Sequence, residues 1–146
     1  MIVRNLFGDV IMKTVLTVGV FDLLHWGHFE LFRRCKELAG IDGRLVVAVQ
    51  EDEVVTKYKP ATVLAYDWDK RRKMISALRY VDEVVPYGDI DESIKGIQFD
   101  VFVVGGDQVH SGFQRAIRWC EENGKQVCRL SRTEGISASQ IRVGIR

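Results

Sequence analysis

Short apolar runs alternate with segments of helical periodicity along the chain. Residues 14–20 (TVLTVGV) and 44–50 (RLVVAVQ) are rich in β-branched residues and almost continuously apolar, as strands buried on both faces should be. Shorter runs predict three further strands, at 83–85, 100–104 and 126–130. Between the strands, apolar spacing and end signals predict helices over 29–38 (stopped near Gly40), 67–80, 113–122 and 137–142.

The helix predicted over 67–80 has a divided pattern. Met74, Ile75 and Leu78 lie on its apolar side, and the charged run 70–73 is expected on its solvent side. The segment between the second strand and this helix, which contains Lys57 and Lys59, shows no strong period. It is expected to be a flexible loop.

Strands that alternate with helices predict a parallel sheet covered by helices on both faces. We therefore expect an α/β fold, a single Rossmann-like domain with a five-stranded parallel sheet. In such folds, ligands bind at the carboxyl ends of the strands, near the switch in strand order. Three polar or glycine-rich stretches follow strands, at 19–28, 105–108 and 131–139, so one site at that edge is expected.

Composition narrows the class of protein. The 146 residues suit one domain, and 47% are hydrophobic and 28% charged. The net charge of +1 argues against a strongly cationic nucleic-acid-binding protein, and no apolar run reaches the roughly 18 residues of a membrane span. Three cysteines without a CxxC pair favour a reducing cytoplasm over a disulfide framework.

The first residues of the chain differ from the rest. Residues 1–11 lack the basic start and long apolar core of a signal peptide, and Met12 stands directly before the first strand. We expect residues 1–12 to be an N-terminal extension ahead of a domain that covers residues 13–146.

Two histidines follow the first strand. His25 and His28 are three residues apart, so both imidazoles can face one side of the first helical turn. A helix N-terminus favours anions, and Gly27 lets a phosphate approach the backbone. Zinc binding is disfavoured because the i, i+4 spacing with a glutamate is missing, and a dinucleotide site because GxGxxG is missing. A purely structural pair, one capping and one packed, remains an alternative.

Two distant motifs make a resemblance specific. GVFDLLHWGH (19–28) and RTEGIS (132–137), with Arg71 and RYVDEVVP (79–86) between them, resemble the cytidylyltransferase family of HxGH nucleotidyltransferases. The resemblance covers nearly all of 13–142 and is greatest to members that act on glycerol 3-phosphate. It implies transfer of CMP from CTP to a phosphorylated alcohol with release of pyrophosphate, Mg²⁺ supplied with CTP, and products used as precursors of cell-surface polymers.

The resemblance also implies roles for individual residues. The catalytic group would be His25, His28, Lys57 and Arg132. Nucleotide binding would fall to Gly19, Val20, Phe21, Gly27, Arg71, Gly106, Asp107, Ile136 and Ser137. Acceptor binding would fall to Asp22, Lys59 and Gln108, and no protein side chain is expected to hold a metal.

Several of these residues have a simpler interpretation. Lys57 and Lys59 would be solvated loop residues, Arg71 would lie on the wet face of its helix, and Asp22 would cap a turn. Three positions depart from the family pattern: Val20 replaces a hydroxyl or thiol residue, Gln108 replaces tryptophan, and Ala138 replaces threonine. These departures leave the acceptor open.

The alternatives fall into three classes. The acceptor could instead be phosphocholine, phosphoethanolamine, a sugar phosphate or a phosphorylated amide, and phosphocholine would want an aromatic cage, for which Tyr66, Trp68 and Tyr87 are candidates. An adenylyltransferase shares HxGH, although RTEGIS argues against it. A non-catalytic nucleotide-binding regulator is the third class. The family resemblance further implies a homodimer. The near-neutral charge and the shortness of the apolar runs predict no nucleic-acid or membrane partner.

Overall fold

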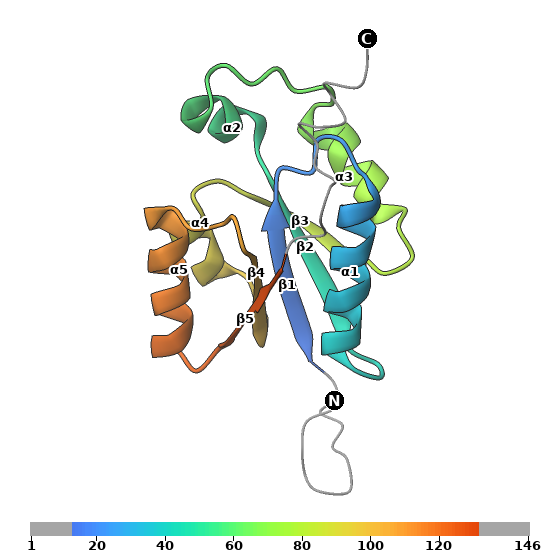
Figure 1. Ribbon diagram of the computed structural model, residues 1–146, viewed down its shortest axis with the longest axis vertical. Helices are drawn as coiled ribbons and strands as arrows, with labels where there is room; N and C mark the ends of the chain where they lie inside the picture. The colour runs from blue at the N-terminus through green and yellow to red at the C-terminus, as the bar shows by residue number, and fades with distance from the viewer. Residues whose placement is uncertain (1–12, 132–146) are drawn as a thin grey trace, which may run out of the picture.

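The computed structural model describes residues 13–131 and contains one parallel sheet. Its strands are β1 (Thr14–Gly19), β2 (Arg44–Gln50), β3 (Glu83–Tyr87), β4 (Val101–Gly105) and β5 (Gln126–Leu130). They are ordered β3-β2-β1-β4-β5, and every neighbouring pair is parallel. The order reverses at β1, so the switch point lies between β1 and β4 (Figure 1). The predicted five-stranded parallel sheet is confirmed.

Helices cover both faces of this sheet (Figure 1). One face carries α1 (Trp26–Ala39) and α3 (Trp68–Ser76), and the other carries α4 (Ile90–Ser93), the 3₁₀ turn η1 (Ile94–Gly96) and α5 (Ser111–Glu122). The short helix α2 (Asp52–Tyr58) stands beyond the carboxyl end of β2. Among residues 13–131, no helix has the length and apolarity needed to cross a bilayer.

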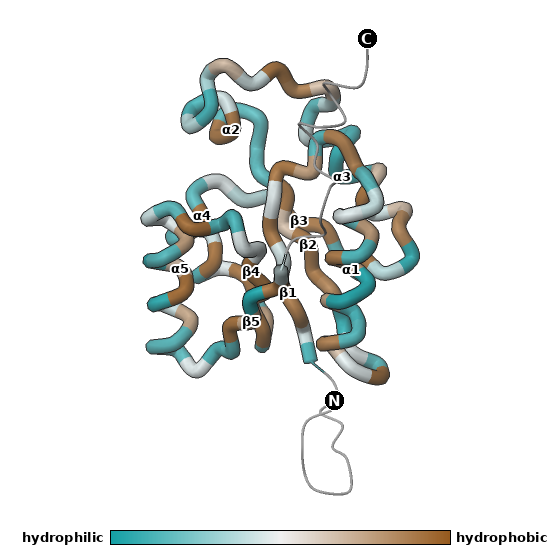
Figure 2. Tube along the Cα trace, in the orientation of Figure 1, coloured by the Kyte–Doolittle hydropathy of each residue, from teal (hydrophilic) through white to brown (hydrophobic). Residues whose placement is uncertain are grey.

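Two apolar cores follow from the alternation of side chains along the strands. Val15 and Val47 point toward α1 and α3, whereas Leu16 and Val46 point toward α4 and α5. Figure 2 shows hydrophobic residues running along the strands, with polar residues on the outer surfaces of the helices. The sheet is therefore packed against helices on both faces, and its carboxyl edge carries the loops.

The helix predicted over 67–80 ends early, at Ser76. Leu78, Tyr80 and Val81 pack against the core below α1, and the N–H of Asp82 donates to the carbonyl of Leu45 at the start of the β2–β3 pairing. The chain must turn here to enter β3, so tertiary packing overrides the helical period.

Other element predictions had mixed outcomes. The helix predicted over 29–38 is α1, with Gly40 at its C-cap at φ 83°. The prediction of a flexible loop after β2 is wrong in part, because this segment contains the helix α2. Neither α4 nor η1 was predicted. The proposed extension at 1–12 and the helix predicted at 137–142 lie outside the described residues.

Candidate active site

Two of the three predicted polar stretches meet at the carboxyl edge of the sheet. Residues 19–28 follow β1 and residues 105–108 follow β4, and these two strands are hydrogen-bonded neighbours. The third stretch starts at Ser131, whose carbonyl accepts a hydrogen bond from Nη1 of Arg34 on α1 at 3.1 Å. The chain is thus tied to the histidine-bearing helix where the described residues end. Arg132, Ile136, Ser137 and Ala138 lie outside them.

The histidine pair forms the start of α1. His25 is the N-cap, and its Nδ1 accepts a hydrogen bond from the N–H of Gly27 at 3.1 Å. Nδ1 of His28 accepts one from the N–H of His25 at 3.3 Å, and the two rings stack with centroids 3.9 Å apart. Because each Nδ1 is an acceptor, the proton of each neutral ring belongs on Nε2. The structural alternative and the phosphate-binding one are therefore compatible: capping uses Nδ1 of each ring, and His28 can still donate through Nε2.

His28 can offer a hydrogen bond to an anion without carrying a charge. Burial, followed by the nearby charge of His25, lowers the pKa of His28 from 6.5 to about 4. His28 is therefore neutral near pH 7 and donates through Nε2. The positive dipole end of α1 adds to this donor.

Arg71 is buried rather than exposed, which corrects the prediction that the run 70–73 lies on the wet face of its helix. Its side chain is 1% exposed. The guanidinium donates to the carbonyls of Val20 at 2.8 Å, Gln50 at 2.9 Å and Tyr66 at 3.1 Å, and pairs with the carboxylate of Asp52. These acceptors come from the ends of β1 and β2, the loop before α3, and α2. Arg71 thus joins the loops of the carboxyl edge, and these bonds use four of its five N–H donors.

Two residues predicted to hold the acceptor are engaged with the backbone. The carboxylate of Asp22 accepts from the N–H groups of Ala65 at 2.9 Å and Tyr66 at 3.0 Å. The amide of Gln108 accepts from the N–H of Gly105 and donates to the carbonyl of Val18, which bridges β4 and β1. Asp22 holds the loop before α3 and Gln108 spans the switch point, so both help to shape the site.

The two predicted lysines stand on or beside α2. Lys57 lies in the last turn, exposed, with Nζ 3.9 Å from a carboxylate oxygen of Asp89. Tyr58 hydrogen-bonds the other oxygen of the same carboxylate. Lys59 is the exposed C-cap. The structure therefore places Lys57 against the turn before α4, and its described contacts do not include the histidine pair.

The turn after β4 is open on one side. Gly106 and Asp107 are exposed, and a Cβ placed on Gly106 would meet no atom closer than 4.0 Å. Tyr87, a candidate for an aromatic cage, is buried and therefore unsuitable for one. Among residues 13–131, no cluster of three or more histidine, cysteine or acidic side chains could hold a metal.

The sequence analysis did not identify three polar residues that hold the loops or helices near the site. Asp52 and Asp89 carry no local signal, since their partners are distant along the chain. His110 did carry a signal. It caps α5 and its Nδ1 accepts from the N–H of Gly112, two residues on, which repeats the His-x-Gly arrangement of His25 and Gly27.

The chain is similar to known proteins over most of its length. The sequence model of the cytidylyltransferase-like family matches residues 16–144. The chain is 38% identical to a glycerol-3-phosphate cytidylyltransferase of Staphylococcus aureus, over 90% of this chain and 93% of the relative. It is 37% identical to an FAD synthase of Methanopyrus kandleri, over 84% and 80%. A lipopolysaccharide core biosynthesis protein of Thermoplasma volcanium superimposes with TM-score 0.70 at 26% identity, over 84% and 99%.

Proposed function

This chain belongs to the cytidylyltransferase-like family, and on that premise we propose that it transfers CMP from CTP to glycerol 3-phosphate and releases pyrophosphate. Its family makes it a nucleotidyltransferase. The observation that carries the proposal is the stacked histidine pair, in which His28 offers an Nε2–H donor beside the N-terminus of α1. This arrangement suits a triphosphate, whose oxygens accept hydrogen bonds.

The proposed reaction needs no general base. The acceptor is a phosphate monoester, whose second pKa is near about 6, so its oxygen is largely ionised at neutral pH. That oxygen forms a bond to the α-phosphorus of CTP as the bond from this phosphorus to the bridging oxygen breaks, and pyrophosphate leaves with the electron pair. The histidines stabilise charge on the phosphoryl oxygens, and the rigid edge keeps attacking and leaving groups in line.

We propose that Mg²⁺ enters as the MgCTP complex. Mg²⁺ commonly binds substrate phosphates together with few protein carboxylates. Asp22 lies in the loop that leads into the histidine pair, and both of its oxygens accept backbone N–H groups. The described residues therefore fit a metal carried by the triphosphate better than one held in a protein cage. Lys57, Arg132, Ile136 and Ser137 complete the proposed phosphate site.

A second candidate is adenylyl transfer. The FAD synthase relative is 37% identical, close to the 38% of the glycerol-3-phosphate cytidylyltransferase, and FAD contains an adenylyl group. Gln108, by resemblance, stands where tryptophan is usual in the glycerol-phosphate enzymes, which also opens the acceptor. A phosphorylated amide, a sugar phosphate, phosphoethanolamine or phosphocholine therefore remains an alternative.

A substrate panel tests the proposal. We would measure pyrophosphate release with Mg²⁺ and CTP or ATP against glycerol 3-phosphate, the alternative acceptors and flavin mononucleotide. Release with CTP and glycerol 3-phosphate is the expected result. Release with ATP and flavin mononucleotide would replace it by the second candidate. Nucleotide binding without turnover for any pair would favour a regulator.

The variant His28→Ala links any turnover to the site. We expect kcat to fall by about 100-fold in a folded protein, because removing one preorganised donor to the transition state costs roughly 3 kcal/mol. His110→Ala is the matched control, since it removes a capping histidine from α5 instead of α1. Equal kcat values for the two variants would remove the histidine pair from the active site.

The assembly and compartment are also part of the proposal. We propose a cytoplasmic homodimer, with product passed to cell-surface polymer synthesis. Trp26 is 60% exposed and Phe29 is 38% exposed on α1, an apolar surface that supports self-association. The free thiols Cys35, Cys120 and Cys128 suit a reducing compartment. Light scattering coupled to gel filtration would report a monomer if the dimer is wrong.

A further inference from the structure

Phe21 has a backbone conformation that bulky residues rarely adopt. Its φ is +51°, in the left-handed region. Among residues 13–131, Asp42 is the other non-glycine residue with positive φ, and aspartate tolerates this region because its short side chain bonds locally. An aromatic residue in this region is strained, and such strain persists only where the surroundings hold it.

Both flanks of Phe21 are held by buried polar groups. The carbonyl of Val20 accepts from Nη1 of Arg71 at 2.8 Å. On the other side, Asp22 accepts from the N–H groups of Ala65 and Tyr66. Arg71 and Asp22 are 1% and 5% exposed. The peptide unit before Phe21 is therefore anchored to α3, and the side chain of the residue after it is anchored to the loop before α3.

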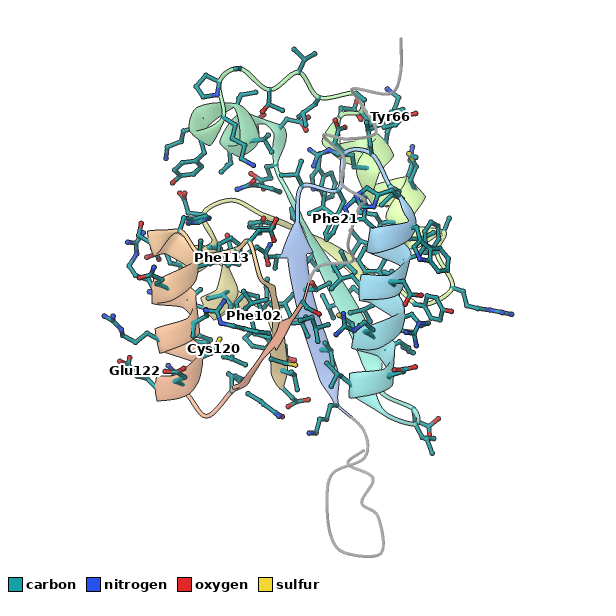
Figure 3. The ribbon with its side chains drawn as sticks, in the orientation of Figure 1. Phe21, Tyr66, Phe102, Phe113, Cys120 and Glu122 are labelled. Carbon is teal, nitrogen blue, oxygen red and sulfur yellow. The ribbon has the colours of Figure 1, made fainter. Side chains whose placement is uncertain are left out.

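The ring of Phe21 lies between the end of β1 and the first turns of α1 (Figure 3). A Cβ placed on Gly19 would come within 2.8 Å of this ring, so the glycine leaves the space that the ring occupies. The ring meets Phe32 edge-on, and it meets His28 at 84° with centroids 5.3 Å apart. His25 stacks on His28 at an interplanar angle of 26°. The imidazole of His28 is thus confined by Phe21 and His25.

We propose that Phe21 is a positioning residue that holds the His28 ring in place, with its strained backbone anchored through Arg71 and Asp22. The Phe21 ring keeps Nδ1 of His28 on the N–H of His25 and directs Nε2 toward the phosphates. This role differs from the backbone contact with the nucleotide that the family resemblance implies. Its kinetic consequence rests on the proposed function, whereas its effect on His28 can be measured without substrate.

The direct test is imidazole NMR of the substrate-free protein. Long-range proton–nitrogen correlations report the tautomer and pKa of each histidine. The variant Phe21→Leu removes the ring edge but keeps a side chain with the same backbone preference. We expect the pKa of His28 to rise from about 4 toward 6.5, and its Nδ1 acceptor signal to weaken. Among the described residues, His25 is the titratable group whose charge contributes to the present value.

A second variant approaches the same ring from the other side. Gly19→Ala removes no apolar contact but pushes the Phe21 ring, so it should shift the His28 signals in the same direction. Phe102→Leu is the matched control, because it shortens a fully buried phenylalanine in the core on the other face of the sheet. An unchanged tautomer and pKa of His28 in a folded Phe21→Leu or Gly19→Ala protein would overturn the proposal.

Kinetics then separate positioning from nucleotide binding. For Phe21→Leu we expect kcat to fall about tenfold or more with KM for CTP nearly unchanged, since misplacement of a catalytic group acts on the transition state. A raised KM at unchanged kcat would assign Phe21 to nucleotide binding and overturn the positioning role. Absence of turnover in the wild-type protein would count against the proposed function alone, and the NMR result would still decide on Phe21.

Discussion

The imidazole of His28 is largely buried and still has an N–H group that can bind a ligand. It is buried enough to stay neutral, yet it keeps one N–H available for a ligand. The reciprocal hydrogen bonds with His25 supply the orientation, because each ring uses Nδ1 for a backbone donor of the first helical turn. The folded chain must hold this ring uncharged, which gives the protein a dependence on pH that can be measured.

We predict that the free energy of unfolding falls as the pH is lowered from about 7 to about 5. The pKa of His28 is about 4 when folded and 6.5 when unfolded, so the unfolded chain binds the extra proton within this range. Stability is therefore lost as the pH falls, by about 2 kcal/mol over that interval. Urea titrations at both pH values measure it.

The variant His28→Asn is the control for this prediction, because it keeps a polar side chain but cannot titrate. Between pH 7 and pH 5, the free energy of unfolding of this variant should fall by about 2 kcal/mol less than that of the wild-type protein. Carboxylates with a lowered pKa affect both proteins alike. The pKa of Asp67, whose carboxylate accepts the N–H of Lys70, is lowered from 3.8, so its contribution is lost mainly below that pH. Parallel curves for the two proteins would contradict the assignment to His28.

At the scale of elements, α3 organises the loops through one buried side chain. Arg71 enters from this helix and reaches the ends of β1 and β2 and the first turn of α2. Five donors in a planar fork allow one residue to satisfy several acceptors, which a single ammonium group cannot do. The next residue, Arg72, instead pairs with Asp69 one turn away at the surface.

Replacement of Arg71 by lysine should therefore destabilise the fold. We expect Arg71→Lys to lower the free energy of unfolding by about 3 kcal/mol or more, because buried carbonyls and the carboxylate of Asp52 lose their donors. Arg72→Lys is the matched control on the same helix and should change stability by no more than about 0.5 kcal/mol. Chemical denaturation measures the free energy of unfolding of both variants. Similar losses in the two variants would mean that Arg71 does not join the loops.

At the scale of the molecule, the sheet separates two cores and places a cysteine in each. Cys35 lies in the core below α1, and Cys120 in the core below α5. Burial raises the pKa of the Cys35 thiol to about 12 and that of Cys120 to about 11. Cys128 on β5 is half-buried. The reactivity of the three thiols therefore reports how accessible to solvent each core is.

Thiol labelling should distinguish these positions. In the folded protein near pH 8, Cys35 and Cys120 should react slowly with Ellman's reagent, since the thiolate is the reactive form and both thiols are buried. Cys128 should react first, and all three should react in denaturant. In the variant Cys128→Ser the rapid phase should vanish. A rapid phase that persists in this variant would show that one of the two cores opens readily.

The sheet and the location of the histidine pair can be predicted from local sequence. Strands such as 44–50 were predicted with the observed bounds, because burial on both faces demands an apolar run that is visible locally. His25 and His28 are three residues apart at the start of a helix, so their proximity depends only on local geometry. The family likewise follows from motifs that lie within short segments.

The bonds that hold the carboxyl edge together depend on contacts between distant segments. Arg71 belongs to a charged run typical of a solvated helix face, and its burial depends on carbonyls from β1 and β2 that the sheet brings to it. The positive φ of Phe21 and the partners of Asp22 depend in the same way on the loop before α3. Local pattern records which residues prefer water, whereas contacts between distant segments determine which polar groups find partners inside the fold.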